Sequence, residues 1–210
     1  DLDSASFGPK VAALGGALPA GTAFAARAGS VPKYDGARLL LVDKPDATQT
    51  YFRIAMPGID RTNPDRVGLM LVNTLFGGRF TSMLNDELRV NSGLTYGASS
   101  MVETNRLPGV VAINTYTRTE STVKAIDLAL EILGRLRKSG VTAEQLVSAK
   151  NYVKGNFPAD ELETADQIAA LLGELELYGL NRGEVDDLFS RIDSITVDRA
   201  NEIARKYYID

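Results

Sequence analysis

The chain has 210 residues and a formal net charge of −4, from 23 basic and 27 acidic side chains, and this acidic balance argues against a nucleic-acid-binding protein. It contains no cysteine and no histidine, which excludes disulfides, thiolate chemistry, a self-contained Ser-His-Asp hydrolase and a His-ligated zinc site. With 44% hydrophobic residues it has enough apolar side chains for a core, in one domain or two small ones. No apolar run approaches about 18 residues, so we expect no membrane span.

Residues 1–36 differ from the rest of the chain. They are rich in Ala and Gly, contain several prolines and lack sustained periodicity. We expect the end of a helix over residues 10–15 and otherwise a linker-like segment over residues 1–36. One domain is expected over residues 37–210.

The domain opens with two predicted strands. Residues 38–44 form a short apolar run, and residues 49–59 alternate between apolar and polar side chains, which is typical of a half-buried strand. An Asn-Pro pair at residues 63–64 then predicts the start of a helix, and a Gly-Gly pair at residues 77–78 predicts its end.

The remaining pattern predicts one more helix, a pair of strands and a series of late helices. Because the strands come early in pairs and the helices cluster late, we expect an α+β fold with an antiparallel sheet. The expected helices are residues 81–90, 120–138, 142–156, 164–179, 184–192 and 197–207, and the expected strands are residues 95–104 and 109–118.

The stretch over residues 84–100 carries the most distinctive chemistry. Arg89 ends a predicted helix, Gly93 permits a sharp turn, and Tyr96 opens a predicted strand, so the two side chains are expected to converge. A guanidinium and a phenol can donate hydrogen bonds to a carbonyl or to a developing oxyanion. The residues alone leave an alternative open, in which Arg89 caps its own helix and Tyr96 packs on the sheet edge.

Several pieces of the chain, in order and over about four-fifths of its length, resemble a known protein family. The resemblance is to the second domain of the pitrilysin/insulinase/mitochondrial-processing-peptidase (M16-type) zinc metallopeptidases, and most of all to bacterial two-domain members. The pieces are LLLVDKPDATQTYFRIAMPG (39–58), PDRVGLMLVNTLFGGRFTSMLNDELR (64–89), GLTYGASS (93–100), AKNYVKGNFPADELETADQIAALLGELELYGL (149–180) and ITVDRANEIARKYY (195–208).

The resemblance implies an antiparallel sheet with helices packed on one face, in one half of a two-domain peptidase. In that family the first domain carries an inverted zinc motif, His-x-x-Glu-His, and the second lacks those ligands but supplies an Arg and a Tyr. The family spacing Arg-x6-Tyr matches Arg89 and Tyr96, which the resemblance therefore assigns to holding the substrate peptide backbone. It implies no catalytic residue, metal or cofactor in this chain, with zinc in the partner domain.

The chain departs from the family at two places beside these residues. Val90, Asn91 and Ser92 stand where relatives carry a charged pair after the Arg, and Met83 stands where many carry Arg. Neither departure removes Arg89 or Tyr96, but both alter the charge of the expected cleft.

The resemblance is compatible with several forms of the complete protein. The chain is expected to be the C-terminal half of a longer peptidase, or a subunit that pairs with a zinc-bearing subunit, and to be inactive alone. Its partners would be that zinc-bearing domain or subunit and a peptide substrate, in a bacterial cytoplasm or periplasm. The alternatives are a catalytically inert scaffold subunit and a peptide-binding module of the same fold.

Overall fold

The computed structural model describes residues 3–22, 29–30 and 36–209 of the chain. It divides into an N-terminal unit, Asp1–Ser30, and a main unit, Val31–Asp210, which are described separately. The expected linker-like segment includes residues 23–28 and 31–35, which lie outside the described residues.

The N-terminal unit contains one helix, α1 (Ser4–Gly16), among its described residues. It is longer than the helix end expected over residues 10–15. The carboxylate of Asp3 accepts hydrogen bonds from the backbone N–H groups of Ala5 and Ser6, and this cap starts the helix ahead of Pro9. None of its residues is buried.

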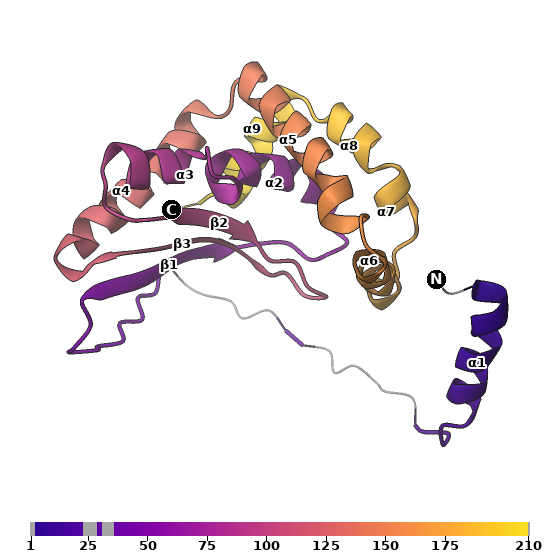
Figure 1. The fold of residues 1–210 in the computed structure, drawn as a ribbon. Helices are drawn as coiled ribbons and strands as arrows, with labels where there is room; N and C mark the ends of the chain where they lie inside the picture. The colour runs from indigo at the N-terminus through magenta and orange to yellow at the C-terminus, as the bar shows by residue number, and fades with distance from the viewer. Residues whose placement is uncertain (1–2, 23–28, 31–35, 210) are drawn as a thin grey trace. The chain divides into compact units, whose positions relative to one another are not determined.

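The main unit is built on an antiparallel sheet of three strands in the order β1-β3-β2 (Figure 1). The strands are β1 (Gln49–Pro57), β2 (Ala98–Val102) and β3 (Val110–Arg118). In the register, Asn114 of the central strand lies opposite Arg53 of β1 and Ser99 of β2. Side chains alternate across a strand, so these three residues share one face of the sheet.

The prediction of a strand over residues 38–44 is wrong. These residues belong to no strand or helix, and a turn follows them in which the N–H of Ala47 donates to the C=O of Lys44 at 3.0 Å. Among the described residues, β1 pairs with β3 alone. The apolar run therefore has the composition of a strand without a neighbouring strand to complete it.

Helices cover one face of this sheet (Figure 1). The predicted α+β fold with an antiparallel sheet and helices on one face is confirmed. The helical elements are α2 (Arg66–Asn73), η1 (Thr74–Gly78), α3 (Met83–Asn85), η2 (Asp86–Asn91), η3 (Thr119–Ser121), α4 (Thr122–Ser139), α5 (Ala143–Glu161), α6 (Ala165–Tyr178), α7 (Gly183–Asp186), α8 (Leu188–Ser194) and α9 (Val197–Tyr207).

The core lies between the covered face of the sheet and the helices α2, α4 and α9. Ile113 of the central strand is fully buried, and Phe76 packs edge-on against Tyr208 with ring centroids 4.9 Å apart. The Tyr208 hydroxyl donates to the side chain of Asn73 at 3.2 Å, so the one polar atom of this large buried side chain has a partner.

The helix starts show how local sequence sets the elements. Thr142 and Thr164 each cap a helix through a reciprocal pair of hydrogen bonds with the glutamine three residues later. The start predicted at residues 63–64 comes too early, because Asn63 caps the Asp65 amide in a preceding turn and α2 begins at Arg66.

The mostly helical segment Arg66–Asn91 is long and apolar enough, by length and composition alone, to cross a membrane. However, 61% of its most apolar window is buried inside the domain, where Leu69, Leu71 and Val72 pack in the core. We therefore interpret it as the core helix of this domain, and the absence of a membrane span stays a prediction.

Candidate functional site

Arg89 and Tyr96 are joined by a tight turn between η2 and β2. Gly93 in this turn has a φ of 63°, a left-handed conformation that glycine adopts without steric cost. The N–H of Leu94 donates to the C=O of Leu88 at 2.9 Å, which closes the turn. The chain therefore reverses direction after the helix and brings Tyr96 back to Arg89.

The guanidinium of Arg89 lies close to two aromatic rings. Its central carbon is 4.6 Å from the ring centroid of Tyr96 and 4.7 Å from that of Phe80. Both rings are largely exposed, Tyr96 at 74% and Phe80 at 64%, whereas Arg89 is half-buried. The expected convergence of Arg89 and Tyr96 is confirmed, and we call Phe80, Arg89 and Tyr96 the Arg89 cluster.

Sequence reasoning missed Phe80. The residue lies in the segment between η1 and α3, directly after the Gly-Gly pair and Arg79, where no helical periodicity describes it. An aromatic residue in a short connection between two helices, with no place in an apolar stripe, is the signal that could have found it.

A buried amide holds the elements of the cluster together. Asn85 is 4% exposed, and its side-chain N–H donates to the C=O of Phe80 at 2.8 Å. Its side-chain oxygen accepts from the N–H of Ala98 at 3.3 Å, at the start of β2. One side chain therefore fixes the Phe80 segment and the strand that follows Tyr96.

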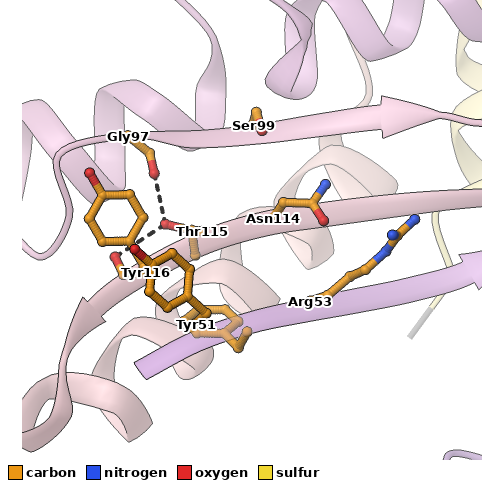
Figure 2. A pocket seen from close by; sticks show the side chains of 8 residues that line it. Tyr51, Arg53, Gly97, Ser99, Asn114, Thr115 and Tyr116 are labelled. Carbon is orange, nitrogen blue, oxygen red and sulfur yellow. Dashed lines mark hydrogen bonds between the residues drawn. The ribbon is translucent and has the colours of Figure 1, made fainter. Parts of the chain in front are cut away.

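A second polar group holds the chain next to Tyr96. The hydroxyl of Thr95 accepts from the N–H of Gly97 at 3.1 Å and lies 3.1 Å from the Thr115 hydroxyl of β3. The Thr115 hydroxyl also donates to the C=O of Gly97 at 2.9 Å (Figure 2). The backbone on each side of Tyr96 is thus tied to the sheet, which leaves its ring to project outward.

The acidic residue nearest to Arg89 in sequence is engaged elsewhere. Glu87 accepts from Arg135 at 2.8 Å and from the side chain of Asn91 at 3.2 Å, and these hydrogen bonds hold the pKa of Glu87 below its usual range. Within the described part of the chain, Arg89 forms no ion pair with a carboxylate. Its guanidinium can therefore donate hydrogen bonds to a ligand oxygen.

A hollow of about 460 Å³ lies on the open face of the sheet, and Gly97, the residue after Tyr96 in the chain, is part of its lining (Figure 2). Tyr51 and Tyr116 stack across β1 and β3 with centroids 5.2 Å apart, and Asn114 and Ser99 supply polar groups. The arrangement offers aromatic surface and hydrogen-bonding groups but none of the usual general bases near neutral pH.

The resemblance places zinc in the partner domain and expects none in this chain. Across residues 3–22, 29–30 and 36–209, no group of three or more His, Cys, Asp or Glu side chains could hold a metal ion. The expectation of zinc in a partner domain therefore remains a prediction.

The fold and this site together define a class: an α+β domain with helices on one face of an antiparallel sheet and an exposed cluster of hydrogen-bond donors. The profile of the family described as "Peptidase M16 inactive domain" matches residues 10–153, well over half of the chain. The chain therefore belongs to the M16 peptidase family, as a domain of the inactive type, and the predicted family is confirmed.

Individual relatives agree with this assignment. An uncharacterized zinc protease of Streptomyces coelicolor is 27% identical over 89% of this chain and 40% of its own length. The solved M16 inactive domain of Pseudomonas fluorescens is 28% identical over 77% of this chain and 38% of that chain, with a TM-score of 0.71. A protease of Helicobacter pylori has the same fold at 21% identity, with a TM-score of 0.87 over 100% of this chain and 51% of its own. The chain thus spans about 40% of the curated relatives it matches.

Proposed function

We propose that this chain is the non-zinc-binding half of a zinc metalloendopeptidase, in which Arg89 and Tyr96 hold the backbone of a substrate peptide. The peptide would lie in the cleft formed with a domain that carries the inverted zinc motif. The observation that carries the proposal is the Arg89 cluster: an exposed phenol and a guanidinium in contact, with no recorded carboxylate partner among the described residues.

The stacking of Arg89 suits it to bind peptide carbonyls. A guanidinium is planar, and its N–H donors point outward in that plane. The rings of Phe80 and Tyr96 both lie within 4.7 Å of its central carbon, so they would restrain the guanidinium in place. A peptide carbonyl is an acceptor with two lone pairs, which fits such a donor.

The part of this chain in catalysis would be to position the peptide. The Tyr96 hydroxyl would donate to the carbonyl oxygen at or beside the scissile bond, and Arg89 to a neighbouring carbonyl. Zinc in the partner domain would polarise the attacking water and the scissile carbonyl. Loss of a donor that acts in the transition state lowers turnover by about 10²–10³-fold.

The test begins with the native assembly. An antibody against this chain should detect, in source cells, either a polypeptide near twice 22.6 kDa or a 22.6 kDa chain that co-purifies with a zinc-bearing subunit. The purified assembly should contain zinc and cleave an unstructured, internally quenched peptide. A band of 22.6 kDa without any zinc-bearing partner would refute the proposal.

Variants of the assembly then test the two residues. Tyr96→Phe keeps the ring beside Arg89 and removes the hydroxyl, so we expect turnover to fall by about 10²-fold with zinc content unchanged. Arg89→Lys keeps the charge but loses the planar donor set, and we expect a similar loss. Tyr152→Phe on α5 is the matched control. Wild-type turnover in both site variants would refute the substrate-holding role of Arg89 and Tyr96, whereas an assembly that cleaves no peptide would favour the inert scaffold.

A further inference from the structure

Four consecutive aliphatic side chains that precede β1 are almost fully exposed to solvent. A single exposed leucine is ordinary in a soluble protein, but a contiguous apolar run of this kind marks an interaction site. The side chains and their exposed fractions are Leu39 at 90%, Leu40 at 87%, Leu41 at 81% and Val42 at 78%.

The backbone of the same segment joins no element of the described structure. Residues 39–42 belong to no helix, strand or turn, and they make no backbone hydrogen bond to another described residue. Backbone N–H and C=O groups in folded proteins are almost always paired once they leave water. An apolar segment whose backbone groups have no partner among the described residues is suited to pair with the edge of a sheet.

The side-chain pattern indicates whether such a strand would be covered on one face or on both. In an extended chain successive side chains point to opposite sides, so Leu39 and Leu41 share one side, and Leu40 and Val42 the other. A strand that is apolar on both sides is typical of one covered on both faces. The free edge of β1 would cover only one side, because the sheet's other face is open and Tyr51 on it is 74% exposed.

We propose that residues 38–44 are an interface strand, which adds to a sheet of the zinc-bearing half and is buried there on both faces. This inference rests on the proposed function, since it requires that half to exist. The chain spans 51% of the Helicobacter pylori protease of the same fold, so in that protein a part of equal size lies outside the match. The segment also follows directly on the linker-like residues 1–36. Strand addition would satisfy the backbone and the side chains together.

The absence of cysteine makes a direct test possible. Leu40→Cys and Leu41→Cys each introduce a unique thiol, one on each side of the segment. Val123→Cys on α4 is the matched control, since Val123 is 71% exposed and lies outside the segment. The rate of modification by a small thiol reagent is measured in the 210-residue chain and in the assembly with the zinc-bearing half.

In the chain alone we expect both segment thiols to react as fast as the control. In the assembly we expect both to react slower by about tenfold or more, with the control unchanged. Slow reaction in the chain alone would mean that the segment docks on its own sheet, and this would overturn the inference. Slow reaction of only one of the two thiols would overturn the inference that the segment is buried on both faces.

Two further outcomes separate this inference from the proposed function. An assembly that contains zinc and cleaves peptide, but in which both thiols react at the control rate, would overturn the interface strand and leave the proposed function intact. If no zinc-bearing half accompanies the chain in source cells, the proposed function fails, and the interface strand fails with it.

Discussion

The side chain of Asn85 accepts a hydrogen bond from the N–H of Ala98 at 3.3 Å. This contact joins α3, which lies between Phe80 and Arg89 in the chain, to β2. The same side chain donates to the carbonyl of Phe80. Asn85→Leu would bury the Phe80 carbonyl and the Ala98 amide without partners. We expect a loss of about 1–3 kcal/mol in the free energy of unfolding, measured with urea. Asn91→Leu, at an exposed position, should change stability far less, and equal losses would contradict the role of Asn85.

Gly77 is required where η1 packs on β2. A Cβ there would lie 2.3 Å from the backbone nitrogen of Ser100, so Gly77→Ala must push the helix from the strand. We expect destabilisation of about 1–3 kcal/mol. Gly173→Ala in α6 is the same substitution in open space and should stabilise by up to about 1 kcal/mol. Urea unfolding of both variants checks the prediction. The two changes in the free energy of unfolding should have opposite signs.

Asp65 contributes to the stability of the fold in a way that depends on pH. Burial raises its pKa, but hydrogen bonds from Lys206 and Tyr207, the latter at 2.7 Å, together with the charge of Arg199 outweigh burial and hold the pKa below its ordinary value. A carboxyl whose pKa is lower when folded stabilises the protein above its unfolded pKa of about 3.9. That stability is lost as the pH falls through the folded value.

Tyr207→Phe tests this contribution by removing one donor to the Asp65 carboxylate. We expect a loss of about 1.5–3 kcal/mol at neutral pH, because the hydrogen bond goes to a charged group. The difference from wild type should shrink as the pH falls below about 3.9 and the carboxylate becomes protonated. Urea unfolding across this pH range measures it, with Tyr152→Phe as control. A loss independent of pH would mean that only packing had changed.

Phe80 is predicted to position Arg89. Phe80→Leu removes one of the two rings beside the guanidinium, so the Nε–H resonance of Arg89 should move toward its value in an unstructured chain, while Phe80→Tyr should preserve it. In the peptidase assembly we expect Phe80→Leu to lower turnover less than Tyr96→Phe does. An unchanged Arg89 resonance in Phe80→Leu would refute the positioning role. Phe7→Leu, at a described exposed position outside the cluster, is the matched control.

The sequence was informative where local chemistry and spacing act together. Arg89 and Tyr96 could be paired in advance because Gly93 allows the turn between them, and the threonine caps of α5 and α6 follow from short-range patterns. Phe80 could not be found in this way. Its place depends on the close approach of η1 to β2 at Gly77 and on the hydrogen bond that joins Asn85 to Ala98 of β2, which are contacts between elements distant in sequence.

The segment over residues 38–44 shows a different limit. Its composition predicts a strand, but a strand needs a neighbour, and composition does not say whether that neighbour belongs to the same unit. The sequence predicts only the end of a helix over residues 10–15, whereas the cap at Asp3 starts the helix earlier.

The hydrogen bonds of Asn85 have a consequence for the way a ligand would meet the Arg89 cluster. Because one buried amide joins the Phe80 segment to β2, the two aromatic rings are set in place during folding rather than at encounter. The conformational entropy of arranging them is then lost before a peptide arrives, and a preorganised surface of this kind binds more tightly than a loose one with the same contacts. Asn85, which need not touch the ligand, would thus set its affinity.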